Sequence, residues 1–175
     1  MTTTARPPQS TAFLLAQVGA HAASTFAARL IHLNLAPAHA GMLRLIHTSS
    51  GISQQALAAM LRLPASRLVG LLDELEQRGL VERRDSPEDR RVYALHLTRK
   101  GGEVLDAVGR IAREHDEAVC AALSLTERET LGGLLRRVAE EQDLTPGVHP
   151  GFSRVGRPSS KEETHGLGHD KPRRR

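Results

Sequence analysis

The chain has 175 residues, 39% of them hydrophobic, which suits one globular domain with room for a tail. Its single cysteine, Cys120, excludes an intramolecular disulfide and a cysteine-based zinc knuckle. The chain holds only three phenylalanines and one tyrosine, and this scarcity argues against modules that stack nucleic-acid bases on aromatic side chains. No segment has the run of about 18 apolar residues that a membrane span needs.

The net charge of +4 is concentrated at one end of the chain. Residues 145–175 carry seven basic and three acidic side chains, so the remaining residues are neutral overall. Any affinity of the folded part for nucleic acid must therefore come from a local concentration of arginine. Because no hydrophobic period survives after residue 144, we expect 145–175 to be a disordered basic tail and the Thr/Pro-rich residues 1–9 to be disordered as well.

The uncharged stretch at residues 7–28 raises the question of export. Its apolar part, residues 12–20, is followed by small residues that loosely match a signal-peptide cleavage site. Gln17 and His21 interrupt the stretch, however, and the helical pattern continues past the supposed cleavage point. The pattern therefore favours a cytoplasmic protein over an exported one.

The first half of the chain reads as helices. Apolar periodicity and capping residues predict helices over about residues 10–33, 37–48, 54–61 and 64–78. The first is apolar on two sides, which is typical either of a core helix or of a helix that meets another subunit. Pro37 suits the first position of the second helix, and Ser53 suits the cap of the third. The fourth carries one apolar stripe and ends before Gly79.

The period then changes to that of strands. Residues 80–84 and 91–97 alternate in polarity and are separated by a turn-rich segment, so they predict a β-hairpin. A long helix follows from the Thr98 cap to about Ala122. A capping box of Thr126 with Glu129 then predicts a last helix that reaches about Gln142.

A short helix, a tight turn, a second helix and a hairpin form the outline of a winged helix-turn-helix. In such folds the second helix lies in the DNA major groove with its N-terminal residues on base edges. Arginines at a hairpin tip suit the negative potential of a narrow minor groove. The tip of this hairpin has four arginines within nine residues: Arg83, Arg84, Arg90 and Arg91.

The run LVGLLDELEQRGLVERRDSPEDRRVYALHLTRKG, residues 68–101, closely resembles the multiple-antibiotic-resistance regulator (MarR) family. The segments 35–47 and 123–138 look like that family's second and last helices, so the resemblance covers roughly residues 10–144. It implies a mainly α fold with a small β wing, in which 10–33 and 98–142 are dimerisation helices and 37–97 is the DNA-binding lobe. It further implies a homodimeric transcription regulator, expected to be a repressor, which binds pseudo-palindromic double-stranded DNA and responds to a small-molecule effector.

Seven residues are candidates for DNA contact: Ser66, Arg67, Arg83, Arg84, Asp89, Arg90 and Arg91. Arg67, near the start of the recognition helix, is the best candidate for a base edge, because arginine forks onto guanine. On spacing alone, Asp89 and Arg91 are equally well a solvated charge run or a pair in which the carboxylate fixes the guanidinium. The family resemblance implies the second reading, with Arg91 in a minor groove.

The exposed face of the recognition helix departs from the family pattern. Val69 and Gly70 stand where relatives commonly have small polar or basic residues, and the acidic Asp73 and Glu74 follow. Carboxylates near phosphates oppose DNA binding. Val69 and Gly70 support the alternative reading, a winged-helix module for protein interaction without sequence-specific DNA binding.

No constellation of catalytic residues, no phosphate-binding glycine loop and no tight pair of metal ligands is present, so we expect a binding protein without enzymatic activity, metal or cofactor. Cys120 is expected to be packed as a small hydrophobe. The resemblance places a small ligand where the dimerisation helices meet the lobe. Five histidines are candidates for the polar lining of that site: His21, His32, His39, His47 and His115.

Overall fold

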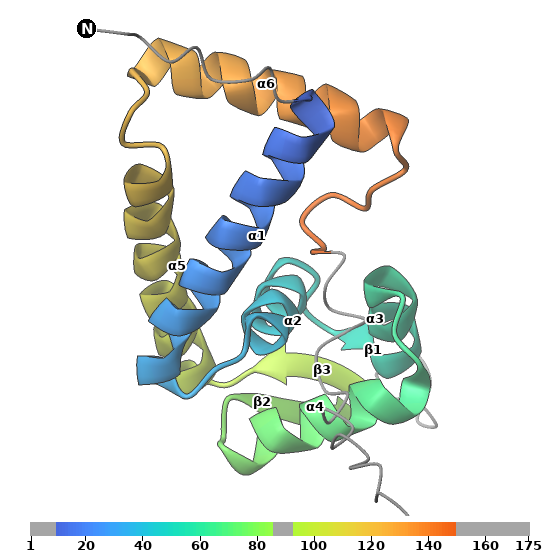
Figure 1. Ribbon diagram of the computed structural model, residues 1–175. Coiled ribbons are helices and arrows are strands. Elements are labelled where there is room, and N and C mark those ends of the chain that lie inside the picture. The colour runs from blue at the N-terminus through green and yellow to red at the C-terminus, as the bar shows by residue number, and fades with distance from the viewer. Residues whose placement is uncertain (1–9, 86–92, 150–175) are drawn as a thin grey trace, which may run out of the picture.

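A computed structural model describes residues 10–85 and 93–149 of the chain, and within them it is mostly helical with a small antiparallel sheet (Figure 1). This confirms the predicted mainly α fold with a β wing. The elements follow in the order α1 (Thr11–Leu30), η1 (Ile31–Leu33), α2 (Pro37–Thr48), β1 (Ile52–Ser53), α3 (Gln54–Leu61), α4 (Ala65–Gln77), β2 (Val81–Asp85), β3 (Tyr93–Leu97), α5 (Arg99–Val119) and α6 (Leu125–Glu141).

Side-chain caps begin most of these helices where the sequence predicts them. The hydroxyls of Ser10, Ser53 and Thr98 each accept a hydrogen bond from the backbone N–H three residues further on. The prediction for α6 was wrong by two residues, because its capping box is Ser124 with Glu127. The Ser/Thr-x-x-Glu spacing occurs twice in this segment, and the earlier pair adds two residues, with their backbone hydrogen bonds, to the helix.

The sheet has three strands in the order β1-β3-β2, all antiparallel. The hairpin of β2 and β3 is confirmed, with a register that runs from Val81 opposite Leu97 to Asp85 opposite Tyr93. Strand β1 was not predicted. It has only two residues, which is too short for any alternation of polarity, and it exists because Ile52 pairs with Leu95 of the hairpin.

One hydrophobic core holds α2, α3, α4 and the sheet together. The leucine stripe of α4 faces this core, with Leu68, Leu72 and Leu75 at most 1% exposed. On α2, eight of twelve residues are buried, among them the polar His39. The described part of the lobe, residues 37–85 and 93–97, is thus packed around one core within a single chain.

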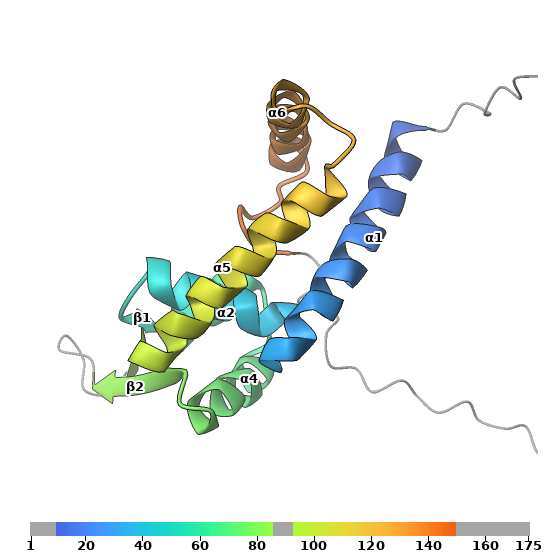
Figure 2. The same cartoon turned by 90° about the vertical axis from the view of Figure 1, so that its left-hand side faces the viewer.

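The remaining long helices extend away from this lobe. Helix α5 runs outward beside α1, and α6 lies across their far ends (Figures 1 and 2). No residue of α6 is buried, and only Leu30 of α1 is. Large apolar side chains are exposed on both helices, namely Phe13, Leu14, Leu15, Val18, Leu125, Leu131, Leu134, Leu135 and Val138.

The start of α5 is fixed to the lobe by close backbone contacts. The Thr98 hydroxyl donates to the Gly79 carbonyl over 2.7 Å, and the Lys100 ammonium donates to the Arg78 carbonyl over 2.8 Å. Gly101 lies so near the Leu80 carbonyl that a Cβ at position 101 would collide with it. Only glycine therefore lets α5 approach the end of α4 this closely.

After α6 the chain turns back toward the lobe as a return segment, residues 142–149 (Figure 1). Asp143 has a left-handed backbone, φ +51°, which reverses the direction. The Gly147 carbonyl accepts a hydrogen bond from the Arg44 guanidinium of α2, and Val148 packs against the core. Residues 145–149, which the sequence assigns to the tail, thus include a contact with α2; the bounds of the tail stay a prediction, and residues 150–175 are outside the described part.

No helix within residues 10–85 and 93–149 combines the length and the apolar character that crossing a bilayer requires.

Candidate nucleic-acid interface

The first turn of α4 faces solvent. Arg62, with its left-handed φ of +50°, makes the tight turn after α3, and Pro64 then stands at the N-cap of α4. Because the leucine stripe buries one side of α4, positions 66, 69, 70 and 73 share the opposite side. Ser66 and Gly70 are exposed, Arg67 is half-buried, and Val69 is 39% exposed. Ser66 is therefore open to solvent at the helix start, whereas Arg67 is only partly so, and the base contacts of both stay predictions.

The acidic residues of α4 are engaged by basic side chains of the lobe. The Arg83 guanidinium of β2 lies 2.6 Å from Asp73 Oδ1 and 2.5 Å from Glu76 Oε2, with only 21% of its side chain exposed. Glu74 Oε2 lies 3.1 Å from Nε2 of the buried His39. Arg83 therefore offsets part of the negative charge of Asp73 and Glu76, whereas His39, whose ring the fold keeps neutral, contacts Glu74 without neutralising it.

Arg83 was expected to contact DNA, but in the structure it pairs with two carboxylates of α4. Instead of facing phosphates, it forks onto two carboxylates and ties the wing to the recognition helix. Sequence reasoning missed this because the carboxylates lie seven and ten residues away, on another element. A signal was nevertheless present: Asp73 and Glu76 are three positions apart on α4, so one fork can reach both.

Arg84 points to the other side of β2, as strand alternation requires. Its side chain is 60% exposed and pairs with Glu82 over 2.5 Å. It borders a hollow of about 330 Å³ at the base of the wing, which His47, Ser50 and His96 also line. Ser50 Oγ and His96 Nδ1 are 3.1 Å apart. Arg84 therefore remains on the surface, beside two histidines that the sequence did not associate with it.

The wing tip lies outside the described residues. Asp89, Arg90 and Arg91 all fall in the 86–92 gap, so their DNA-binding roles stay predictions. The strand ends on either side, Asp85 and Tyr93, are paired with each other.

His39 fixes the start of α2 and contacts the recognition helix. Its Nδ1 accepts the backbone N–H of Ala36 over 3.2 Å, so the hydrogen of the neutral ring sits on Nε2, toward Glu74. Burial lowers the pKa of His39 below its usual value, although the Glu74 carboxylate opposes this. The neutral ring is therefore the form that the fold favours.

A cavity of about 570 Å³ opens between α1, α2, α5 and the return segment. Its walls are mostly apolar, with Arg44 as the permanently charged member, and its lining is Ala23, Ser24, Phe26, Ala27, Pro37, Ala40, Gly41, Arg44, Val108, Ala112, Gly147 and His149. None of the five histidines expected at a ligand site lines it. Arg44 was missed because an arginine near the end of a helix looks like an ordinary surface residue.

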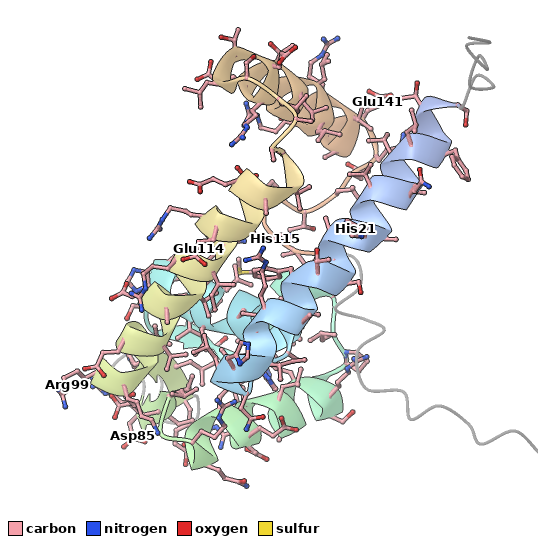
Figure 3. All side chains as sticks on the ribbon, turned by 60° about the vertical axis from the view of Figure 1, so that its left-hand side comes forward. His21, Asp85, Arg99, Glu114, His115 and Glu141 are labelled. Carbon is pink, nitrogen blue, oxygen red and sulfur yellow. The ribbon has the colours of Figure 1, made fainter. Side chains whose placement is uncertain are left out.

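The five histidines do not gather at one site, although His21 of α1 and His115 of α5 lie near each other (Figure 3). His115 stacks at a tilt on Phe26, with ring centroids 5.4 Å apart, and so lies between α5 and α1, while Glu114 is on the exposed surface of α5 (Figure 3). Burial lowers the pKa of His115. Within the described ranges no group of three metal-ligating side chains comes together. Cys120 is half-buried at the end of α5.

Comparison with known proteins places this geometry among transcription regulators. The model of the MarR family matches residues 33–92. A putative transcriptional regulatory protein for the hcr operon of Thauera aromatica is 40% identical over 106 residues, which are 61% of this chain and 64% of the relative. Transcriptional repressor MprA of Escherichia coli K12 is 40% identical over 75 residues, 42% of either chain. The aligned part thus spans less than two thirds of these relatives.

Among solved structures, the transcriptional repressor CouR bound to a 23-mer DNA duplex has a TM-score of 0.67 and 29% identity. That match covers 74% of this chain and 92% of CouR. The similarity extends beyond the lobe that the family model matches, because it takes in most of the described residues.

Proposed function

The chain belongs to the MarR family of DNA-binding transcription regulators, and we propose that it represses transcription by binding a pseudo-palindromic operator as a homodimer, from which a small ligand releases it. The named relatives are regulators rather than enzymes. The observation that carries the proposal is the exposed first turn of α4, beside which Arg83 offsets part of the charge of Asp73 and Glu76. This pairing lessens the repulsion between the helix and the phosphates.

Apart from Arg83, we expect the DNA contacts to be those that the sequence predicts. Ser66 and Arg67 enter the major groove, with Arg67 on a base edge. Arg84 and Arg90 lie near phosphates, and Arg91 enters a minor groove, oriented by Asp89. Arg83 supports these contacts indirectly, because it holds the wing against α4.

A homodimer is proposed because α1 and α6 expose apolar side chains that the chain itself does not cover. The segments 10–33 and 98–142 then form the dimer interface across a two-fold axis, and 37–97 forms the DNA-binding lobe. Two recognition helices in such a dimer enter successive major grooves about 10 bp apart, centre to centre.

The ligand site is proposed at the 570 Å³ cavity, where α1 and α5 meet α2. Its size and mostly apolar walls suit a small organic molecule. A ligand there lowers DNA affinity only if it binds more tightly to a dimer whose half-site spacing does not match DNA.

The test is fluorescence anisotropy on the DNA upstream of this protein's own gene, at several salt concentrations. We expect the intact protein to prefer this DNA over random duplex by about a thousandfold or more. Arg67→Ala should cost about 1–3 kcal/mol and relax the preference at one position of each half-site. Gln77→Ala, at the exposed far end of α4, is the control and should change neither quantity.

If the intact protein binds both DNAs equally at every salt concentration, the regulator proposal fails. The exposed Val69 on α4 would then favour the protein-interaction module instead.

A further inference from the structure

We propose that the return segment, residues 142–149, is a built-in competitor for the cavity between α1, α2 and α5. It occupies Arg44, and a ligand that joins an apolar body to a carboxylate displaces it by taking the same guanidinium. The consequence for DNA binding rests on the proposed function; the competition itself does not.

The first observation is where the return segment lies. The Gly147 carbonyl accepts a hydrogen bond from Arg44 Nη2 across 103 positions of sequence, and Val148 packs against the core beside it. Gly147 and His149 also form part of the cavity wall. One side of the cavity is therefore a short segment, fixed by the Arg44 hydrogen bond, by the Val148 side chain and by an interaction of His149, rather than a packed helix.

The second observation is the fit of glycine at position 147. Its φ is +72°, a backbone conformation that strains other residues. A Cβ at this position would also collide with Arg44 Nη2, so the guanidinium would have to move away. The backbone thus requires glycine, and alanine would in addition push the flexible end of Arg44 away from the segment, so this change should weaken the attachment of the segment to α2.

The chemistry of Arg44 identifies the class of ligand. In the structure the Arg44 guanidinium donates one hydrogen bond to a neutral acceptor, the Gly147 carbonyl oxygen. A carboxylate offers two charged oxygens to the planar guanidinium and therefore binds it more strongly. Apart from Ser24 and His149, the rest of the wall is apolar side chains and backbone. A monocarboxylate with a hydrocarbon body satisfies both parts of the site.

Release of the segment connects ligand binding to the rest of the molecule. The return segment leaves α6 and ends on α2, so it bridges the helices proposed for dimerisation and the DNA-binding lobe (Figure 1). A ligand that takes Arg44 removes that bridge. The two states therefore differ by a defined contact, which gives the ligand its differential affinity.

The experiment uses the full-length chain with benzoate as the probe and benzamide as its neutral isostere. Hydrogen exchange followed by mass spectrometry reports on residues 142–149, and titration calorimetry reports the affinity. We expect benzoate, but not benzamide, to accelerate exchange in the return segment. In Gly147→Ala the segment should exchange fast without ligand, and the dissociation constant of benzoate should fall by about three- to tenfold, because no competitor remains.

Two further variants sharpen the result. Gly102→Ala is the matched control, since a Cβ there meets nothing within 4 Å, and it should leave exchange and affinity unchanged. Arg44→Gln should abolish the preference for benzoate over benzamide. Val148→Ser removes the apolar contact of the segment with the core and should have the same effects as Gly147→Ala.

Equal exchange of the segment in wild type and Gly147→Ala would overturn the proposal. So would failure of benzoate to bind the Gly147→Ala variant, or equal benzoate affinity in the two proteins. Operator binding measured alongside separates this from the proposed function. If the segment responds as expected but the protein shows no operator preference, the competitor proposal is supported and the proposed regulator function is refuted. If the operator is bound but the segment does not respond, the regulator function is supported and the competitor proposal is refuted.

Discussion

The winged lobe buries its large apolar side chains, whereas the helical arm of α1 and α6 leaves many of them exposed. In the lobe, Leu57, Leu72 and Leu95 are at most 1% exposed, and the core continues through α2, α4 and the sheet. In the arm, α6 buries nothing and its Leu125 is 78% exposed. The lobe is complete as one chain, whereas the arm has the surface of half an interface.

This difference has an energetic meaning. Covering a leucine or valine side chain is worth about 1.5–3 kcal/mol, so the arm leaves a large stabilisation unused in the single chain. A helix of about 15 residues without tertiary packing is only marginally stable in water. We therefore expect the arm, and α6 above all, to depend on a second copy for its order, as in the proposed dimer, and the lobe not to.

The largest effect is expected where the arm is broken. Leu131→Asp combined with Leu134→Asp places four charges in a symmetric interface and removes four leucines from it. The dimer should lose about 6 kcal/mol or more, a factor of over about ten thousand in its dissociation constant. Sedimentation at micromolar concentration should then show a monomer.

Met60→Asp is the control for this variant. Met60 is an exposed apolar residue of the lobe, 37% accessible, and its loss should leave the dimer intact. A double variant that still sediments as a dimer would show that α6 is not in the interface.

The second prediction compares leucines of the two regions in that monomeric background. Leu72→Ala should lower the free energy of unfolding by about 2–5 kcal/mol, because it empties a packed site. In the monomeric background, Leu135→Ala on the arm should lower the free energy of unfolding by less than about 0.5 kcal/mol. The same change should cost more in the dimer, where this side chain would be covered. Urea unfolding of both variants measures this, and similar costs in the monomer would refute the division into two regions.

The third prediction concerns the tie between wing and recognition helix. Arg83→Ala leaves Asp73 and Glu76 uncompensated, and because these groups are partly exposed the loss of stability should be about 1–2 kcal/mol. Operator affinity should fall as well, since the wing loses its anchor. Arg83→Lys should restore only part of either, because one ammonium cannot fork onto two carboxylates.

The neighbouring Arg84→Ala serves as the comparison within the same strand. Arg84 is exposed, so this variant should change stability by no more than about 0.5 kcal/mol while still weakening DNA binding. Equal losses of stability at positions 83 and 84 would argue against the tie.

The smallest effect is a pH dependence that originates at His39. Its pKa is lowered in the folded chain, so the unfolded chain binds more protons at mildly acidic pH. The stability that the neutral ring contributes is complete above the unfolded pKa of about 6.5 and is lost as the pH falls through the lower, folded value. The slope from this one group is at most about 1.4 kcal/mol per pH unit.

His39→Gln should flatten this dependence in urea unfolding between about pH 7 and pH 5. Glutamine at the same helix position can still accept the Ala36 N–H, so the helix start is kept. The exposed His47→Gln is the control. If the pH slope of stability survives in His39→Gln and disappears in His47→Gln, the prediction is wrong and the effect originates at His47.

Features encoded by neighbours in sequence could be predicted, and those encoded across elements could not. Ser53 and Thr98 marked their helix starts, and the α4 leucines marked the core, because caps and stripes involve residues three or four apart. Strand β1, the Arg83 pairs and the Gly147 contact each join segments whose proximity only the folded chain creates. The wing-tip residues Asp89, Arg90 and Arg91 stay predictions.

Because Gly101 packs directly against the Leu80 carbonyl, α5 is rigidly attached to the lobe at its N-terminal end and can act as a lever. With 21 residues at about 1.5 Å each, the lever is roughly 31 Å long. Because its base does not hinge, a tilt of only about 10° at the far end would swing the whole lobe by roughly 5 Å. A displacement of that size moves a recognition helix by almost half the width of a major groove, which is about 12 Å. Small rearrangements among α1, α5 and α6 would thereby be geometrically amplified at the DNA, with no need for the lobe itself to deform.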